Sequence, residues 1–251
     1  MPPRPSPYLL IDIGNSRVKF ALSTADRLSK RRECLTQGLT TTRIRQTLAG
    51  WKFGRVVLCS VVPRATAVCW QHFGDAVTEL THRSPLGFGF RYPKPATVGP
   101  DRLADVLAMS VLYAEQGEPG IVMDFGTAVT FNVLSSDRHY LGGVIAPGLQ
   151  LMTEYLHERT ALLPAVRLRE PKEAIGRSTE SAILSGAAHG YRGMVRGILE
   201  SLTRELGRDA KPVVVATGGV APWITAGMRE VHVTDPDLTL HGLRLLGNLT
   251  A

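Results

Sequence analysis

The stretch YLLIDIGNS, residues 8–16, decides how the rest of the chain is interpreted. It is an apolar run that stops at Gly14 and Asn15, which is typical of a buried strand followed by a tight turn. Residues 18–23 resume as the hairpin partner of that strand. The run ends with a carboxylate, Asp12, which is costly to bury unless a cation, a metal-bound water or several donors meet it. Asp12 is therefore a candidate functional residue.

The same pattern returns about 112 residues later. The motif DFGTA, residues 124–128, ends a second apolar run that begins at residue 120, and residues 129–134 supply its hairpin partner. In each copy the glycine lets backbone N–H groups approach a phosphate closely. Two copies predict a pseudo-symmetric α/β protein built from two similar halves.

The remaining periodicity fills in both halves. In the first half we expect strands at 8–15, 18–23, 31–35, 55–62 and 77–81, and helices at 41–48, from Pro63, and at 100–115. In the second half we expect strands at 120–127, 129–134, 141–146, 213–216 and 231–234, and helices at 148–160, 179–206, after 219, and at 238–249. Residues 82–98 form a long loop rich in proline, glycine and aromatic residues, a kind of loop that is often functional.

Composition limits the class of protein. The chain has 251 residues, of which 44% are hydrophobic and 20% charged, so we expect a globular protein rather than a disordered one. No apolar run approaches the ~18 residues of a membrane span, and the N-terminus lacks a signal-peptide pattern. We therefore expect a cytoplasmic protein that does not bind a membrane, with residues 1–7, MPPRPSP, as a disordered tail.

The three cysteines form no CxxC pair and no cluster with histidine, which favours buried apolar cysteines over a disulfide framework or a zinc site. The net charge of +7 lies entirely in the first half. Residues 1–120 hold sixteen Lys and Arg against nine Asp and Glu, whereas the remainder holds thirteen of each. A basic half can attract ATP or nucleic acid, but no nucleic-acid-binding motif accompanies the charge. The run Lys30–Arg32 is most simply a solvated strand entry.

These motifs resemble those of the type III pantothenate kinases, in the actin/Hsp70/sugar-kinase superfamily, over essentially the whole chain. The resemblance rests on DIGNSRVK at 12–19, the segment from Tyr92 to GPDR at 99–102, DFGTA at 124–128, GGVIAPG at 142–148, and Thr179 ahead of Ala182 and Ser185-Gly186. The GxDR element is specific, because ordinary sugar kinases lack it in this place. The family also includes proteins described as Bvg accessory factors.

The resemblance implies an α/β fold of two tandem actin-like (ribonuclease H-like) subdomains, residues 1–117 and 118–251, with an ATP cleft between them. It implies the ATP-dependent phosphorylation of pantothenate to 4'-phosphopantothenate, the first step of coenzyme A biosynthesis. It also implies Mg²⁺, a monovalent cation (K⁺ or NH₄⁺), and a homodimer with the pantothenate site at the dimer interface.

The nucleotide site draws on both halves. By resemblance, Asp12 faces the Mg²⁺–phosphate region, directly or through water, with a structural hairpin carboxylate as the alternative. The ATP phosphates would be lined by Gly14, Asn15, Ser16 and Lys19 from the first half and by Thr127 from the second.

In the second half, Asp124 is assigned to the monovalent cation by resemblance. Gly218 and Gly219 would pass under the adenine or ribose, with a simple turn as the alternative.

Asp101 is the expected base that accepts the substrate hydroxyl proton. Pro100 helps to start its helix, and the helix N-terminus favours the ionised carboxylate. We expect a low pKa to be acceptable, because a loose transition state needs the proton acceptor only late. The alternative role for Asp101 is an N-terminal capping carboxylate. Asp105, one turn later, is more simply solvated or paired.

Four further residues are expected at the pantothenate. Arg102 can offer a planar fork to the pantothenate carboxylate; the alternative is a salt bridge with Asp105 or Asp12. Tyr92 corresponds to a substrate tyrosine of the family, or is a packed loop aromatic. Gly99 and Pro100 would let the backbone approach the substrate.

Thr179 resembles a substrate-binding residue, although it could instead cap the long helix, a role that Ser178 could also fill. Two positions depart from the family pattern: Ser16 replaces a common Thr and keeps the hydroxyl, and Pro100 replaces Ala or Val at a helical position that proline tolerates.

Two other functions stay open at this point. One is an ATP-binding regulatory protein without significant kinase turnover, which the accessory-factor name and the basic half favour. The other is a phosphotransferase or phosphatase that acts on a sugar or a polyphosphate, against which GxDR and Tyr92 argue. The chain has no HExxH, no Walker loop and no GxSxG element, so zinc hydrolysis, a P-loop kinase and a hydrolase elbow lack support.

Overall fold

The computed structural model describes residues 7–207 and 209–250, so the predicted tail before residue 7 lies outside the described residues. Two β-sheets with flanking helices confirm the α/β class. The chain divides into two compact units. Unit 1 contains the chain up to Tyr113, Arg138–Tyr140, and the chain from Asp237 onward; unit 2 contains Ala114–Asp137 and Leu141–Pro236.

Unit 1 is built on a five-stranded sheet. Its strands are β1 (Tyr8–Ile13), β2 (Arg17–Ser23), β3 (Leu28–Leu35), β4 (Val56–Ser60) and β5 (Val77–Glu79), in the order β3-β2-β1-β4-β5. Its helices are α1 (Thr41–Thr47), α2 (Pro63–Phe73), α3 (Pro100–Leu112) and α8 (Leu238–Leu249), with 3₁₀ turns at Gly74–Ala76 and Pro95–Thr97. The central strand β1 pairs antiparallel with β2, as the hairpin pattern predicts, and it also pairs parallel with β4.

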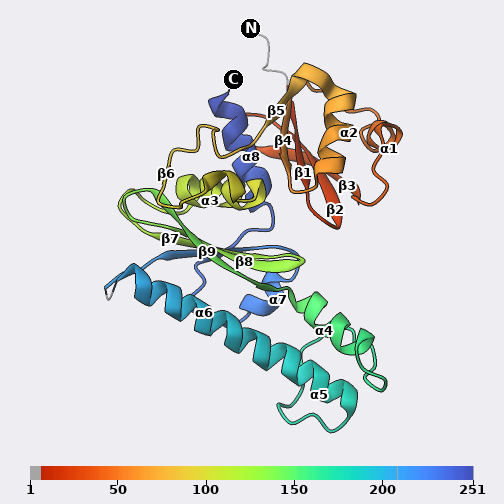
Figure 1. The fold of residues 1–251 in the computed structure, drawn as a ribbon, viewed down its shortest axis with the longest axis vertical. Helices are drawn as coiled ribbons and strands as arrows, with labels where there is room; N and C mark the ends of the chain where they lie inside the picture. The colour runs from red at the N-terminus through yellow and green to blue at the C-terminus, as the bar shows by residue number, and fades with distance from the viewer. Residues whose placement is uncertain (1–6, 208, 251) are drawn as a thin grey trace. The chain divides into compact units, whose positions relative to one another are not determined.

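All six residues of β1 are buried, because helices cover both faces of the strand. Its odd-numbered residues belong to the apolar cluster that includes Ile44 of α1 and Cys69 of α2. Side chains alternate along a strand, so Asp12 lies on the opposite face together with Tyr8. Gly247 of α8 packs directly against the Tyr8 ring on that face. Figure 1 shows α2 and α8 on opposite sides of the unit 1 sheet.

The last helix belongs to unit 1, whereas the sequence pattern assigned residues 238–249 to the second half. The reason is close helix packing: Gly242 of α8 lies against the backbone of Ala104 in α3, so closely that a side chain at Gly242 would overlap it. Unit 1 also ends at Tyr113 rather than at residue 117 before the chain enters unit 2.

The basic run on β3 lies at the sheet edge and is exposed, but it is not simply solvated. Arg31 forms a two-pronged ion pair with Asp237. Arg32 donates to the carbonyl oxygens of Thr47 and Ala49 and stacks over the Trp51 ring, 4.9 Å from its centroid. Part of the basic charge therefore anchors and protects an edge strand.

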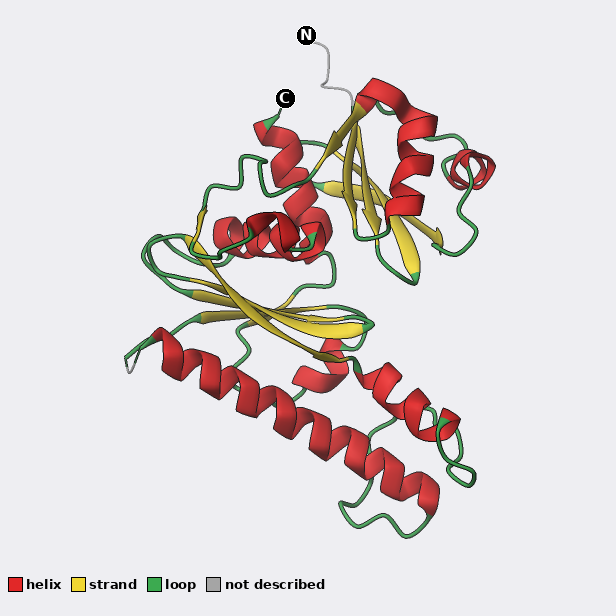
Figure 2. Ribbon diagram, in the orientation of Figure 1, coloured by secondary structure: helices red, strands yellow, loops and turns green. Residues whose placement is uncertain are grey.

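Unit 2 repeats the plan of unit 1. Its strands are β7 (Gly120–Phe125), β8 (Ala128–Leu134), β9 (His139–Pro147), β10 (Val213–Thr217) and β11 (Val233–Thr234), in the order β11-β10-β7-β8-β9. Its helices are α4 (Leu149–Glu158), α5 (Thr179–Ser185), α6 (Tyr191–Leu206) and α7 (Ala221–Thr225). Residues of α4, α6 and α7 join the odd-numbered residues of β7 in one apolar core, and Figure 2 shows α6 running along that side of the sheet.

Three details differ from the predicted elements. The helix expected at 179–206 contains a π-helical turn, Gly186–Gly190, between α5 and α6. The strand expected at 231–234 shortens to two residues. The loop 82–98 contributes a two-residue strand, β6 (Gly89–Phe90), which pairs with His139 and Tyr140 at the start of β9. No helix in the described part of the chain is long and apolar enough to cross a membrane.

Asp105 provides a test of how α8 is held. Its carboxylate is fully buried and accepts a hydrogen bond of 2.7 Å from the Thr239 hydroxyl. We expect Thr239→Val to lower the free energy of unfolding by about 1–3 kcal/mol, because the isosteric side chain leaves a buried carboxylate short of a donor. Urea unfolding measures the change, and Thr42→Val on the exposed side of α1 is the matched control. Equal losses in the two variants would contradict the assignment.

Candidate active site

Asp12, like Asp105, is a buried carboxylate of unit 1, with 8% of the residue exposed. In register, Lys19 of β2 and Cys59 of β4 flank it on the same face. The Lys19 Nζ atom lies 3.8 Å from Asp12 Oδ2. Burial raises the Asp12 pKa from 3.8 to about 6; the Lys19 charge lowers it and the Asp101 charge raises it further. The carboxylates of Asp12 and Asp101, both predicted site residues, therefore repel each other electrostatically.

The turn after β1 is exposed to solvent and is held in place by Thr36. Residues 14–16 separate β1 from β2, as the sequence pattern predicts, and a 3.0 Å hydrogen bond from Gly14 N to Arg17 O closes the turn. Asn15 and Ser16 are exposed, as a ligand-binding role requires. Thr36 clamps the turn: its hydroxyl donates to Gly14 O at 2.7 Å and its N–H donates to Ser16 O at 3.1 Å.

The sequence pattern missed Thr36, because it lies 22 residues from Gly14 and carries no local motif. Only the pairing of β2 with β3 brings it to the turn.

Helix α3 begins at Pro100, as predicted, and Gly99 is its N-cap residue. Asp101 Oδ1 accepts a 2.8 Å hydrogen bond from the Arg102 N–H. The expectation of a low pKa is wrong in direction, because burial raises the Asp101 pKa more than the Arg102 N–H and guanidinium lower it. The structure explains why position 99 is a glycine, which the sequence pattern did not: a side chain there would overlap the Asp101 carboxylate.

The loop residue Tyr92 and the helix residue Arg102 meet at a third residue, Tyr140 of β9. The Tyr92 and Tyr140 rings lie edge-to-face, with centroids 5.8 Å apart and an interplanar angle of 73°. The guanidinium of Arg102 lies over the Tyr140 ring, 5.9 Å from its centroid. All three belong to unit 1, so the structure brings the two predicted pantothenate residues together around a tyrosine that the sequence analysis did not single out.

In unit 2, Asp124 ends β7 as Asp12 ends β1, but its neighbours are different. It is half-buried, and its register partners are Thr130 of β8 and Thr217 of β10. Hydroxyl oxygens thus replace the ammonium and thiol that flank Asp12. Asp124 faces away from the unit 2 core, because the core contains the odd-numbered residues of β7.

A backbone hydrogen bond from Gly148 holds the turn after β7. The turn spans residues 126–128, and the carbonyl of Thr127 accepts a 3.0 Å hydrogen bond from Gly148 N. A side chain at Gly148 would overlap the Thr127 carbonyl, so this glycine permits a close approach of two backbones. Thr127 itself is exposed.

The two glycines after β10 differ. Gly218 has φ +97°, and a side chain there would meet the Phe125 backbone at 2.5 Å, so packing explains this glycine. Gly219 is exposed and faces open space. Contact of either glycine with adenine or ribose stays a prediction.

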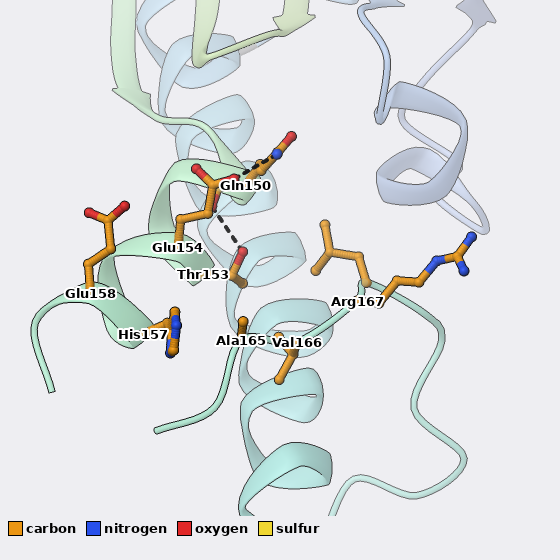
Figure 3. Close-up of a pocket in the computed structure, with 9 residues that line it drawn as sticks. Gln150, Thr153, Glu154, His157, Glu158, Ala165, Val166 and Arg167 are labelled. Carbon is orange, nitrogen blue, oxygen red and sulfur yellow. Dashed lines mark hydrogen bonds between the residues drawn. The ribbon is translucent and has the colours of Figure 1, made fainter. Parts of the chain in front are cut away.

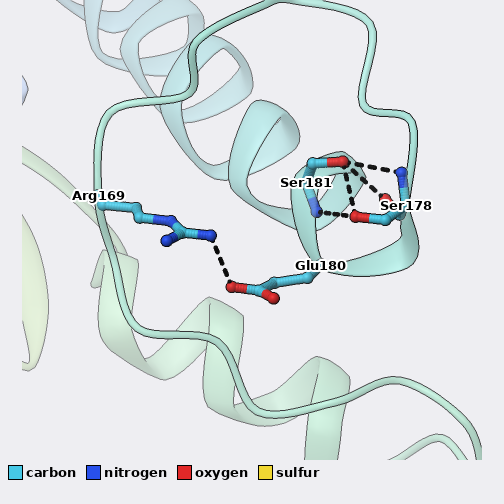
Figure 4. Close-up of polar contacts among 4 residues, drawn as sticks. All are labelled: Arg169, Ser178, Glu180 and Ser181. Carbon is cyan, nitrogen blue, oxygen red and sulfur yellow. Dashed lines mark hydrogen bonds and ion pairs between the residues drawn. The ribbon is translucent and has the colours of Figure 1, made fainter.

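Thr179 does not cap α5. Ser178 is the N-cap and forms a capping box with Ser181: each backbone N–H donates to the other hydroxyl, at 2.9 and 3.2 Å (Figure 4). Thr179 is exposed at the first position of the helix. Figure 1 shows α5 at the far end of the long helix from the unit 2 strands.

A pocket of about 380 Å³ lies elsewhere in unit 2. Figure 3 shows it between α4, which presents Glu154, His157 and Glu158, and the segment 165–167. The Glu154 carboxylate already accepts a 2.7 Å hydrogen bond from Gln150. None of its lining residues belongs to the predicted site. Of the predicted residues, unit 1 therefore holds Asp12, Gly14, Asn15, Ser16, Lys19, Tyr92, Gly99, Pro100, Asp101 and Arg102, and unit 2 holds Asp124, Thr127, Thr179, Gly218 and Gly219.

Comparison with known proteins adds to this geometry. A sequence model of the type III pantothenate kinases matches residues 8–201. A type III pantothenate kinase of Akkermansia muciniphila is 45% identical over 243 residues, covering 96% of this chain and 98% of that protein. Another, of Methylacidiphilum infernorum, is 40% identical and covers 96% and 88%.

Solved structures agree on the fold. A conserved putative Baf family transcriptional activator from Campylobacter jejuni gives a TM-score of 0.64 at 21% identity, covering 96% of this chain and 98% of its own. MreB 5 of Spiroplasma citri, bound to AMPPNP, gives 0.58 at 11% identity, covering 99% and 98%. These likenesses support the actin-like fold class.

The raised pKa of Asp12 predicts a pH-dependent stability. Between pH 3.8 and about 6 the folded protein binds more protons at Asp12 than the unfolded chain, so stability falls as pH rises through this range. Above pH 6 the full cost is present. We expect Asp12→Asn to raise the free energy of unfolding by roughly 1–3 kcal/mol at pH 7.5 and by little at pH 4.

Urea unfolding at the two pH values measures this difference, with Asp75→Asn, an exposed carboxylate of unit 1, as the control. A variant no more stable than the wild type at pH 7.5 would show that Asp12 is not destabilised by burial.

Proposed function

Since this chain belongs to the type III pantothenate kinase family, we propose that it transfers the γ-phosphoryl group of ATP to pantothenate through the residues around Asp12 and Asp101. The product is 4'-phosphopantothenate, and the reaction is the first step of coenzyme A biosynthesis. The observation that carries the assignment is a match to this family over nearly the whole chain, with the GxDR element at the start of α3.

Asp101 is the proton acceptor in this proposal. The pantothenate hydroxyl oxygen forms a bond to the γ-phosphorus, the bond from that phosphorus to the ADP oxygen breaks, and the hydroxyl proton passes to the Asp101 carboxylate. Its raised pKa makes this carboxylate a stronger base than an exposed aspartate. The hydrogen bond from the Arg102 N–H fixes one oxygen and supports an oriented carboxylate.

In this proposal the phosphates and Mg²⁺ are bound by Asp12, Lys19 and the turn after β1. Carboxylate oxygens suit Mg²⁺, which is commonly held by one or two carboxylates together with phosphates and waters. Asp12 fits this chemistry, because among the described residues the ammonium of Lys19, at 3.8 Å, is the one cation that offsets its buried charge. When bound, the metal would neutralise charge on the transferring phosphoryl group.

On the unit 2 side, we assign Asp124 to a monovalent cation and Thr127, Gly218 and Gly219 to the nucleotide. One half-buried carboxylate with threonine oxygens in register on both sides is a donor set for a cation of low charge. The exposed Thr127 hydroxyl supports a phosphate contact. We place the enzyme in the cytoplasm, where ATP is available.

The pantothenate would be held by Tyr92, Gly99, Pro100 and Arg102, with the guanidinium of Arg102 on its carboxylate. Thr179 would complete the site from the partner subunit of a homodimer. The exposure of Thr179 supports such a role, as does the fact that Ser178, not Thr179, caps α5.

Two features of unit 2 support the homodimer. Exposed apolar residues gather on α4 and in the segment that follows it, namely Leu151, Tyr155, Leu156, Leu162 and Ile175. Exposed glycines recur along the π-turn and α6, at Gly186, Gly190, Gly193 and Gly197, and leave open space above the helix. A second copy would remove this apolar surface from water.

The kinase assignment predicts a specific loss. We expect ADP release that requires pantothenate, depends on K⁺ over Na⁺, and falls at least 100-fold in Asp101→Asn, because a general base contributes about 10²–10⁴ in rate. A coupled assay with ATP and Mg²⁺ measures it, and Asp75→Asn is the matched control.

Each outcome has a distinct meaning. Activity that persists in Asp101→Asn would remove Asp101 from its role and keep the kinase. ATP binding without turnover in the wild type would favour the regulatory alternative, and a salt-dependent DNA titration would follow.

The homodimer predicts a mass of twice 27.3 kDa. We expect the double variant Leu151→Glu/Tyr155→Glu to be a monomer by light scattering and to lose pantothenate turnover, because two charges would enter an apolar interface. Leu35→Glu, an equally exposed leucine of unit 1, should stay dimeric. A fully active monomer would contradict a shared site.

A further inference from the structure

Tyr140 belongs to none of the sequence motifs, yet residues of the predicted unit 1 site pack around it. It is fully buried. The centroid of its ring lies 5.8 Å from the ring centroid of Tyr92, 6.0 Å from that of Phe90, and 5.9 Å from the guanidinium carbon of Arg102. Phe88 extends the series of rings, 5.8 Å from Phe90. One tyrosine therefore contacts both the loop and the helix that carry the predicted pantothenate residues.

The backbone around Tyr140 is fixed on both sides. Gly89 N donates to Arg138 O at 2.8 Å, and Arg91 N donates to Tyr140 O at 3.0 Å, so the loop that carries Tyr92 is tied to β9. Arg138 has φ +60°, and its guanidinium donates to Ser110 O of α3 at 2.6 Å. The ring thus has a defined position relative to α3.

The chemistry of Tyr140 points to positioning rather than to proton transfer. Burial raises its pKa to about 12, so the phenol stays protonated at any pH at which the kinase would act. Its aromatic face attracts a cation, and the Arg102 guanidinium lies within the range of about 6 Å from the ring centroid over which this attraction acts. This attraction opposes the entropy that a long arginine side chain loses when it is held in one rotamer.

We propose that Tyr140 is a positioning residue: its ring holds the guanidinium of Arg102 and the ring of Tyr92 in the geometry that receives the pantothenate carboxylate. This inference rests on the proposed function. Arg102 is the residue after Asp101, but the two side chains have different roles in this proposal. If the guanidinium of Arg102 were no longer held in one rotamer, substrate binding would weaken while the Asp101 base would stay in place.

The test separates affinity from turnover. We expect Tyr140→Leu to raise the KM for pantothenate about tenfold, with kcat and the KM for ATP changed less than about threefold. Tyr140→Phe keeps the ring and should stay within about twofold of the wild type. Phe73→Leu is the matched control, because Phe73 forms an edge-to-face pair with Phe53, at 6.1 Å, among residues outside the site.

A substrate lacking the carboxylate identifies the group through which Tyr140 acts. With pantothenyl alcohol, in which a hydroxymethyl group replaces the carboxylate, Tyr140→Leu and the wild type should have the same KM. Adding Tyr140→Leu to Arg102→Ala should raise the KM for pantothenate by less than it does in the wild type, because the Arg102 guanidinium through which Tyr140 acts is already absent.

Pentafluorophenylalanine in place of Tyr140 covers the case in which the leucine variant does not fold. It keeps the shape of the ring and removes its negative face, and it should raise the pantothenate KM several-fold above that of Tyr140→Phe. An unchanged KM in the fluorinated variant, or equal effects with pantothenate and the alcohol, would overturn the proposal. Absence of pantothenate turnover in the wild type would instead overturn the proposed function.

Discussion

Burial of the Asp12 carboxylate at the end of β1 costs free energy that its ion pair with Lys19 offsets only in part, since the Asp12 pKa stays raised to about 6. The cost follows from the fold: β1 is covered on both faces, and side-chain alternation puts Asp12 on the face where α8 packs. Asp101 adds a second negative charge to this region. The two carboxylates therefore concentrate negative charge that Lys19 compensates only in part, and this charge lowers the stability of the folded protein at neutral pH.

The two units use one plan with different chemistry. Apart from β6, which adds a sixth strand beside β9, both sheets have the same strand order, and both central strands lead into Asp-x-Gly. In register with the aspartate, unit 1 places an ammonium and a thiol, whereas unit 2 places two threonine hydroxyls. The turn is also one residue longer in unit 1. These differences break the pseudo-symmetry at the strand ends, which is the place where a repeat can bind two unlike charges without changing its core.

Local patterns predicted what depends on neighbouring residues: the strands, the two strand-end aspartates, and the start of α3 at Pro100. Contacts between residues far apart in the chain were out of reach, because no local motif records them. Thr36 reaches the turn only through strand pairing, and Tyr140 meets Tyr92 only through β6. The return of α8 to unit 1 likewise depends on a glycine that fits the backbone of α3.

Asp101 shows why a correct position can come with an incorrect pKa. The helix N-terminus stabilises the ionised carboxylate, and the hydrogen bond from Arg102 N acts in the same direction. Both effects act over one turn of helix and are visible in sequence. Desolvation depends on what covers the carboxylate, including the close fit to Gly99, and it is the largest effect. The result suits an acceptor of a hydroxyl proton: burial increases basicity, while the helix terminus and Arg102 limit the rise.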